Sequence, residues 1–328
     1  MKRLGTLLLA ALCAVMAHAA SAQDKLFTKP LKIIVAFGPG SATDVTARIL
    51  AEHMRQFVGQ TVLVENKPGA FGIVAIEEMA RARPDGHTMM IGNVSTSALT
   101  PQLYRKRFSI DPDKDIVAIT RVSVIPGFQL VSPKHMPVKT LAEFIAYAKE
   151  RPGQIRYSTT GVGAFTHFEG EVFQRRAGIK MVHIPVKEGP PAMVRDILAG
   201  DVHIASMTMS TAGGLVASGQ LKPLVTSMDQ RVPEYPDVPT MTEAGFPRVG
   251  TPNWSMLFVH SQTPKPLQDA LHAAVTQALK SDALKAAYQK TLTYATPSAS
   301  IGEAQAWLKD EMVRWKQIMD EVKIEVEQ

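Results

Sequence analysis

Two loops rich in glycine and hydroxyl residues have the composition of anion-binding sites. The first loop, residues 37–44, has the sequence FGPGSATD, and the second, residues 158–167, has the sequence STTGVGAFTH. Each loop follows an apolar run and precedes a segment with helical periodicity. A strand-to-helix loop presents free backbone N–H groups and the positive end of the helix dipole, and both favour a carboxylate. We therefore expect main-chain amides in these two loops to bind a small anion.

The first loop offers close backbone approach and hydroxyl donors. Its candidate binding residues are Phe37, Gly38, Pro39, Gly40, Ser41 and Asp44. Glycine lets a ligand approach the backbone, Ser41 adds a hydroxyl, and Phe37 forms an apolar wall. Asp44 would repel a carboxylate, so we expect it to cap the helix or to hold a water molecule. The alternative is a loop with an ordinary helix N-cap and no ligand.

The second loop also combines glycines and hydroxyl residues before a predicted helix, and it contains more hydroxyl groups than the first. Its candidates are Ser158, Thr159, Thr160, Gly161, Thr166 and His167. His167 either contacts the ligand or a water molecule, or is a structural histidine at a helix start. The single G-x-G lacks the later glycines of a dinucleotide-binding loop, so a nucleotide is not predicted.

Three further segments supply candidates at the ends of predicted strands. Asn93 follows an apolar run, and the alternative for it is a polar turn. Lys187, Glu188 and Gly189 follow another run, where a surface ion pair between Lys187 and Glu188 is the alternative to a ligand contact. Met207 and Thr208 follow residues 202–206, with Met207 as an apolar wall or as part of the core.

Apolar runs alternate with helix-periodic segments, and this pattern predicts an α/β fold with largely parallel sheets. Strands are expected at residues 31–37, 61–65, 87–91, 116–122, 127–131, 155–158, 180–184, 202–206, 221–226 and 254–259. Helices are expected at residues 45–57, 72–82, 167–177 and 190–199, and mainly helical structure is expected after residue 259. Capping-box sequences at Thr140, Thr240 and Ser300 predict helix starts.

The first 22 residues have the layout of a secretory signal peptide. Lys2 and Arg3 precede a short apolar run, and Ala20-Ser21-Ala22 forms an A-x-A cleavage site. We expect this segment to be removed and the mature protein to reside in the periplasm; the alternative is an uncleaved anchor. Cys13 lies inside the segment and is the one cysteine of the chain, so no disulfide is expected.

Composition and motifs argue against several other classes of protein. The chain has 36 Lys and Arg residues against 30 Asp and Glu, but no basic stripe with interleaved aromatic residues, so nucleic-acid binding is not predicted. After the leader there is no apolar stretch long enough to insert into a membrane. We find no nucleophile elbow, zinc-protease motif or phosphate-binding P-loop, so we expect no enzyme, cofactor or metal. A secreted hydrolase with a dispersed site is the enzymatic alternative.

Seven segments in order carry a resemblance to a known family. They are residues 29–35 (KPLKIIV), 39–44 (PGSATD), 64–70 (VENKPGA), 84–88 (PDGHT), 157–163 (YSTTGVG), 182–185 (VHIP) and 236–245 (PDVPTMTEAG). In these segments the chain resembles the extracytoplasmic solute receptors of the tripartite tricarboxylate transporter system, called Bug receptors. The resemblance covers essentially the whole chain after the leader.

The resemblance implies a two-lobed type II periplasmic binding protein, or Venus flytrap, with a central sheet in each lobe. It places the signal peptide at 1–22, the first lobe at 23–123, the second lobe at 124–227, and the return to the first lobe at 228–328. It implies a monomeric receptor that captures a di- or tricarboxylate or an aromatic carboxylate and delivers it to membrane transporter subunits. The alternative within the same fold is a sensory receptor that presents its ligand to a signalling partner.

Three departures from the family pattern concern the ligand. The usual Pro-Gly-Gly is Pro39-Gly40-Ser41, and the usual Lys-Gly-Gly is Lys187-Glu188-Gly189. Where the family often has an aspartate, after the strand at 202–206, this chain has Met207-Thr208-Met209-Ser210. Because an aspartate there would pair with an amino group, its absence argues against an amino acid as ligand.

Overall fold

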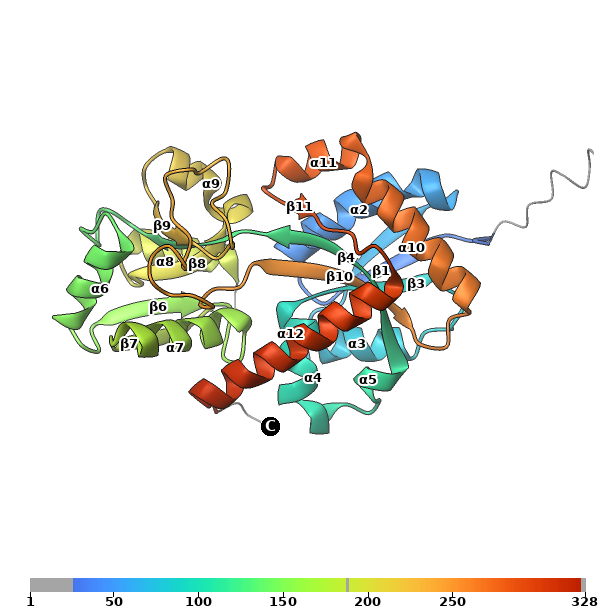
Figure 1. The fold of residues 1–328 in the computed structure, drawn as a ribbon, viewed down its shortest axis with the longest axis horizontal. Helices are drawn as coiled ribbons and strands as arrows, with labels where there is room; N and C mark the ends of the chain where they lie inside the picture. The colour runs from blue at the N-terminus through green and yellow to red at the C-terminus, as the bar shows by residue number, and fades with distance from the viewer. Residues whose placement is uncertain (1–25, 187–188, 326–328) are drawn as a thin grey trace, which may run out of the picture.

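The computed structural model describes residues 26–186 and 189–325. Within these residues the strands form two sheets, one of six strands and one of five, each packed between helices (Figure 1). We call the part built on the six-stranded sheet the first lobe and the part built on the five-stranded sheet the second lobe. The predicted leader, residues 1–22, lies outside the described residues.

The six-stranded sheet has the order β11-β4-β10-β3-β1-β2. Its strands are β1 (Leu31–Val35), β2 (Val62–Asn66), β3 (Thr88–Asn93), β4 (Ile116–Ile125), β10 (Asn253–His260) and β11 (Tyr294–Ala295). β1 pairs in parallel with β2 and β3, whereas β10 runs antiparallel to both β3 and β4.

The five-stranded sheet has the order β7-β6-β8-β5-β9. Its strands are β5 (Gly127–Val131), β6 (Ile155–Thr159), β7 (Met181–Pro185), β8 (Ile204–Thr208) and β9 (Lys222–Thr226). β6 pairs in parallel with β7 and β8, and β5 runs antiparallel to β8 and β9. Both sheets are therefore mixed, and the prediction of largely parallel sheets is wrong. Strands β4, β5 and β10 adjoin the passages of the chain between the lobes, and each is antiparallel to the strands with which it pairs.

Helices cover both faces of each sheet because their apolar residues recur at helical spacing. The first lobe buries α2 (Ala42–Val58), α10 (Lys265–Lys280) and α11 (Asp282–Gln289) on one face, and α3 (Ile73–Ala80) and α12 (Ile301–Val322) on the other. The second lobe buries α6 (Leu141–Lys149) and α7 (Phe165–Ala177) in one core, and α8 (Pro190–Ala199) and α9 (Met209–Ala217) in another. Short helical segments are η1 (Ala70–Gly72), η2 (Val94–Leu99), α4 (Thr100–Leu103), η3 (Arg105–Arg107) and α5 (Pro112–Asp115).

The chain passes from the first sheet to the second at Pro126, which separates β4 from β5. It returns between β9 and β10. Most of this return segment packs on the second lobe, where Thr226 bridges to Thr240 and Met241 and Val249 join the buried core. The last helix, α12, crosses the first lobe diagonally and reaches α7 of the second, where Arg176 pairs with Glu321 at 3.0 Å (Figure 1). Two passages of the chain and the long helix α12 thus connect the lobes.

Two of the three capping boxes start helices as predicted. Thr140 accepts from the Glu143 amide and begins α6, and Ser300 does the same for Glu303 and α12. Thr240 also accepts from the Glu243 amide, but only turns follow. Gly245, at a φ of 90°, and Pro247 stop the helix after one turn, so the expectation of a helix there is wrong.

Among the residues that the structure describes, no helix is both long and apolar enough to cross a lipid bilayer.

Candidate functional site

A cavity of about 140 Å³ lies between the two lobes and is lined from both. The first lobe contributes Phe37, Ser41, Ala42, Thr43, Asn93 and Ser95. The second lobe contributes Gly127, Thr160, Phe165, Thr166, Pro190, Met193, Ser206, Met207, Thr208 and Thr211, and the return segment and the start of β10 contribute Thr251 and Asn253. None of these side chains is ionisable. Among the described residues, an anion in the cavity would therefore meet dipoles and hydroxyl groups and no charged side chain.

The structure brings seven of the candidate residues to the wall of this cavity. They are Phe37, Ser41, Asn93, Thr160, Thr166, Met207 and Thr208. Nine others do not line it: Gly38, Pro39, Gly40, Asp44, Ser158, Thr159, Gly161, His167 and Gly189. Lys187 and Glu188 lie outside the described residues. Part of each loop thus lines the cavity, and ligand binding by these residues stays a prediction.

The buried carboxylate of Asp44 holds the first loop in place. Its side chain is only 2% exposed and accepts hydrogen bonds from the Gly40 amide at 2.9 Å, Asn66 Nδ2 at 2.8 Å and Arg48 Nε at 3.0 Å. Burial alone would raise the pKa of Asp44, but these three donors hold it below its usual value. The Gly40 amide is consequently occupied and is not a free donor. Asp44 fixes the loop that begins α2 and does not contact the cavity.

Ser41 and Asn93 connect the loop to the neighbouring strand. Ser41 is the N-cap of α2, where its Oγ accepts from the Asp44 amide at 3.3 Å. Asn93 caps η2 through a hydrogen bond from the Thr96 amide, and its Nδ2 lies 3.4 Å from Thr43 Oγ1. The ends of β1 and β3 therefore meet at one corner of the cavity, as expected for parallel neighbours.

Two stacked histidines support the second loop. His167 Nδ1 accepts from the Gly163 amide at 3.2 Å, and its ring lies 3.7 Å from that of His183 on β7. His183 Nε2 in turn lies 2.6 Å from Thr159 Oγ1, which also accepts from the Gly161 amide. Burial lowers the pKa of each imidazole to about 4, and for His183 the neighbouring His167 adds to the shift. His167 is thus a structural residue behind the loop.

Because His167 and His183 are buried in the neutral form, we expect the protein to lose stability in mild acid. The unfolded chain protonates a histidine near pH 6.5, whereas the folded chain resists until about pH 4. Stability is therefore present above pH 6.5 and falls, as pH drops through that window, by about 1.4 kcal/mol per pH unit for each imidazole. We expect His183→Gln, which can still bond to Thr159, to reduce this slope in urea unfolding between pH 6.5 and 4.5. Equal slopes for both proteins would contradict the assignment.

Four helices direct their first turns at the cavity. The cavity wall includes Ser41 to Thr43 of α2, Phe165 and Thr166 of α7, Pro190 of α8, and Thr208 and Thr211 of α9. α2 belongs to the first lobe and the other three belong to the second. Each helix N-terminus carries a partial positive charge of about half an elementary charge. These N-termini therefore give the cavity a positive potential, and no lining residue within 26–186 and 189–325 has a charged side chain.

Several lining residues were not among the candidates. Met193 lies inside α8 and Thr211 lies inside α9, whereas the predicted site residues Gly189 and Thr208 precede these helices. Gly127 begins β5. Thr251 and Asn253 come from the passage between lobes, and Asn253 Oδ1 is buried with no hydrogen-bond partner among the described residues. No local motif marks these positions, because only the fold brings them to the cavity.

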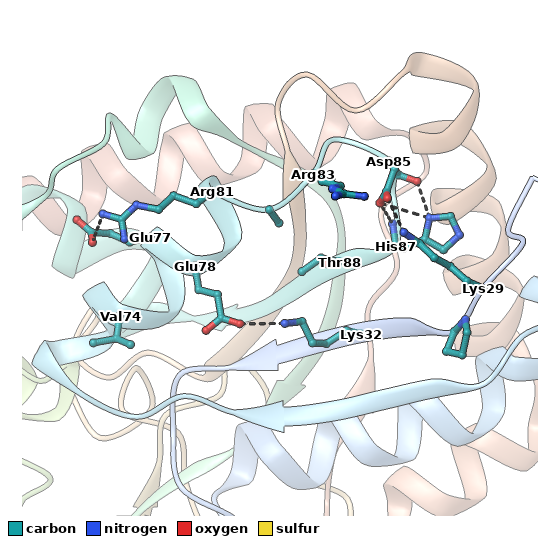
Figure 2. Close-up of a pocket in the computed structure, with 12 residues that line it drawn as sticks. Lys29, Lys32, Val74, Glu77, Glu78, Arg81, Arg83, Asp85, His87 and Thr88 are labelled. Atoms are coloured by element: carbon teal, nitrogen blue, oxygen red, sulfur yellow. Dashed lines mark hydrogen bonds and ion pairs between the residues drawn. The ribbon is translucent and has the colours of Figure 1, made fainter.

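A larger hollow of about 720 Å³ lies on the first lobe alone, over β1, α3 and β3 (Figure 2). It is lined by many charged groups, but these are mostly paired with one another. Lys32 contacts Glu78 at 2.9 Å, Lys29 contacts Asp85 at 2.8 Å, and Arg81 contacts Glu77 at 2.9 Å. Since the second lobe contributes no residue to it, lobe closure would not enclose a ligand there. The smaller cavity between the lobes is the better candidate site.

The chain matches a known protein family over most of its length. Residues 46–324 match the tripartite tricarboxylate transporter family receptor. The protein BugT of Bordetella pertussis is 30% identical over 301 residues, which is 91% of this chain and 90% of BugT. A UPF0065 protein of the same organism is 31% identical over 82% of both chains.

Solved structures with the same architecture include proteins with bound carboxylates. The periplasmic binding protein BugD superposes with a TM-score of 0.80 at 28% identity, covering 91% of this chain and 99% of BugD. Rpa4515 of Rhodopseudomonas palustris with adipate gives 0.82 at 27% identity, covering 90% and 98%. MatC of the same organism with malate gives 0.77 at 26% identity, covering 89% and 99%. The prediction of a two-lobed periplasmic binding protein fold is confirmed.

Proposed function

Because the chain belongs to the tripartite tricarboxylate transporter receptor family, we propose that it captures a small carboxylate by lobe closure and delivers it to a transporter of the tripartite type. In this role the protein binds its ligand without transforming it. The proposal includes export to the periplasm, removal of residues 1–22, and function as a monomer.

One observation carries the proposal: four helix N-termini from two lobes meet at a cavity in which no described lining residue has an ionisable side chain. Such termini bind anions through free N–H groups and the helix dipole. A metal ion or an organic cation would be repelled by the same field. The carboxylates found in Rpa4515 and MatC, adipate and malate, are consistent with this chemistry.

Closure follows from the placement of the contacts on both lobes. A ligand shifts a conformational equilibrium only by the difference in its affinity for the two states. An anion at α2 alone would bind the open and closed forms equally, whereas one that also reaches α9 favours the closed form. Hydrogen bonds to a charged group contribute about 1.5–3 kcal/mol each, so three or four are compatible with micromolar affinity, about −8 kcal/mol, after ordering costs.

We propose the lobe limits that the resemblance implies, which are 23–123, 124–227 and 228–328, with a change to the last boundary. The packing favours one adjustment, since Val232, Val238, Met241 and Val249 are buried in cores of the second lobe. We therefore place the return to the first lobe near Thr251.

The test is a thermal-shift screen of the purified protein against carboxylates, with small-angle scattering on any hit. A ligand at 100 times its dissociation constant should add about 2.7 kcal/mol to the stability of the folded state. We expect a dicarboxylate to raise the melting temperature, to reduce the radius of gyration, and to be recovered chemically unchanged. No stabilisation by any carboxylate at millimolar concentration would refute the proposal, and turnover of the hit would favour a hydrolase.

A further inference from the structure

The turn between β2 and α3 has a strained backbone. Ala70 and Phe71 have φ values of 44° and 59°, in the left-handed region that residues other than glycine rarely adopt. Neighbouring contacts enforce this conformation, because the Phe71 carbonyl accepts from Thr100 Oγ1 at 2.8 Å and a Cβ on Gly72 would come within 2.6 Å of the Thr96 side chain. Strain of this kind is typical of functional sites, yet no residue of the turn lines the cavity between the lobes.

The strained turn holds a large aromatic side chain in solvent. Phe71 is 50% exposed, but its ring stacks on that of Tyr104, with the ring centres 4.6 Å apart and the planes 12° from parallel. Tyr104 is only 3% exposed, so it fixes the position of the Phe71 ring. Val74, which is 44% exposed, follows one turn later and borders the charged hollow (Figure 2). An exposed ring that is already ordered binds a partner at a lower entropic cost.

Basic side chains border the aromatic pair. The Arg107 guanidinium lies 5.5 Å from the centre of the Tyr104 ring, and Lys106 precedes it in η3. Arg105 is paired with two aspartates, whereas no carboxylate of the described residues lies within ion-pair distance of Lys106 or Arg107. Aromatic and arginine side chains contribute most of the binding energy in many protein interfaces. We call the following residues the docking patch: Phe71, Val74, Lys106 and Arg107.

The strained turn packs directly behind one corner of the cavity. Gly72 lies against Thr96, whose hydroxyl accepts from the Asn93 amide at 2.9 Å. Asn93 lines the cavity, and Ser95 of the same segment accepts from the Phe165 amide of the second lobe. A partner bound at the docking patch would therefore lie close to the contact between the lobes without occupying the cavity.

The pattern of charges favours a protein partner over a lipid surface. The unpaired cations Lys106 and Arg107 attract carboxylates, but Glu77 and Glu78 border the same hollow as Val74 and would be repelled by anionic lipids. Segments that bind such lipids usually carry clusters of roughly four to eight basic residues. One exposed ring beside two cations instead matches an apolar pocket with carboxylates at its edge.

We propose that the docking patch binds the membrane subunits of the transporter, at an apolar pocket bordered by carboxylates. The Phe71 ring enters this pocket, and Lys106 and Arg107 pair with the carboxylates at its edge. This rests on the proposed function and assigns the surface by which the receptor docks. The strained backbone is kept because it presents the ring to the partner.

Two substitutions of Phe71 separate docking from folding. Phe71→Ala and Phe71→Gly both remove the ring, but only glycine relieves the left-handed backbone. We expect Phe71→Gly to melt about 2–4 °C above Phe71→Ala. We expect both variants to bind the transporter's membrane subunits in nanodiscs at least tenfold more weakly than the wild type. Biolayer interferometry measures this binding with malate, with adipate and with no carboxylate.

Arg107→Glu tests the charge of the patch, and we expect it also to weaken docking at least tenfold. Lys285→Glu is the matched control, because Lys285 is exposed on α11, on the opposite face of the sheet from α3. Leu63→Ser is the apolar control, since Leu63 is 56% exposed on β2. We expect neither control to change docking more than twofold. Carboxylate-induced thermal shifts should be equal in all variants, because no residue of the docking patch lines the cavity.

The outcomes separate the docking patch from the proposed function. Unchanged docking by the two Phe71 variants and Arg107→Glu would overturn the inference and leave the proposed function standing. Equal binding of the wild type to phosphatidylglycerol nanodiscs without the subunits would show a lipid surface as the partner and would also overturn it. Equal melting temperatures of the two Phe71 variants would remove the strained turn from the argument and overturn it as well. Absence of wild-type binding to the membrane subunits in all three conditions would overturn the inference together with delivery to the transporter.

Discussion

Ser41→Asp is expected to abolish carboxylate binding, with a loss of affinity of at least 100-fold. Ser41 lines the cavity and caps α2, so an aspartate there would place a negative charge beside the free amides of Ala42 and Thr43. Two like charges about 4 Å apart repel by about 4 kcal/mol at the effective dielectric of a protein surface. That repulsion, measured as a change in dissociation constant by calorimetry, exceeds the contribution of any single hydrogen bond in the site.

Ser41→Asn is the matched control for this variant. Asparagine also accepts from the Asp44 amide at the N-cap, so α2 should begin at the same residue. We expect Ser41→Asn to weaken binding less than tenfold. Equal dissociation constants for the two variants would show that the ligand does not approach Ser41.

The positions of the two strand-to-helix loops could be predicted because their signals are local. A strand followed by small residues and a helix fixes where the free amides lie, and residues 37–44 and 158–167 show this pattern within ten residues each. The N-caps at Thr140 and Ser300 were predictable for the same reason, since a capping box is complete within four residues.

The lining of the cavity could not be predicted because it depends on contacts between distant segments. Thr251 reaches the cavity only because the return segment passes between the lobes. Ser158 and Thr159 have the composition of ligand contacts, but they point into the second lobe, where both are 1% exposed. His167 is the last residue of the second loop, yet its ring stacks on His183 of β7 and does not line the cavity. Sequence composition identifies a loop, and packing decides which of its side chains face the cavity.

The mixed sheets have a related explanation. Alternating strands and helices predict parallel pairing, as seen for β1 with β2 and β3. A strand that enters from the other lobe begins at the end of the sheet where β3 ends, and so it runs antiparallel, as β10 does between β3 and β4. This reversal lets Thr251 and Asn253, just before and at the start of β10, lie at the same end of the sheet as Asn93 of β3.

Glu169→Gln is expected to stabilise the protein, with a margin that grows from pH 5 to pH 8. Glu169 lies on α7, is only 6% exposed, and its Oε1 has no hydrogen-bond partner among the described residues. Burial raises its pKa from 4.5 to about 8, although Thr251 and Arg314 oppose the shift. The folded protein therefore holds a neutral acid where the unfolded chain releases a proton.

The sign of the effect follows from the two pKa values. Below pH 4.5 both states are protonated and Glu169 costs nothing. Between pH 4.5 and 8 the unfolded state is favoured by about 1.4 kcal/mol per pH unit, so the cost reaches about 3 kcal/mol near neutral pH. Glutamine has nearly the same shape as the protonated acid and removes this cost.

Urea unfolding of the wild type and of Glu169→Gln at several pH values checks this result. Glu150→Gln is the matched control, because the Glu150 side chain is 73% exposed, and we expect no growing margin for it. The site should respond as well, because Glu169 lies one turn after Thr166 and contacts Thr251, and both of these residues line the cavity. Ionisation of Glu169 above pH 8 brings a negative charge toward the bound anion, so dicarboxylate affinity should fall there in the wild type and less in Glu169→Gln. A margin between wild type and Glu169→Gln that is constant from pH 5 to 8 would mean that the carboxyl group is already ionised in the folded protein.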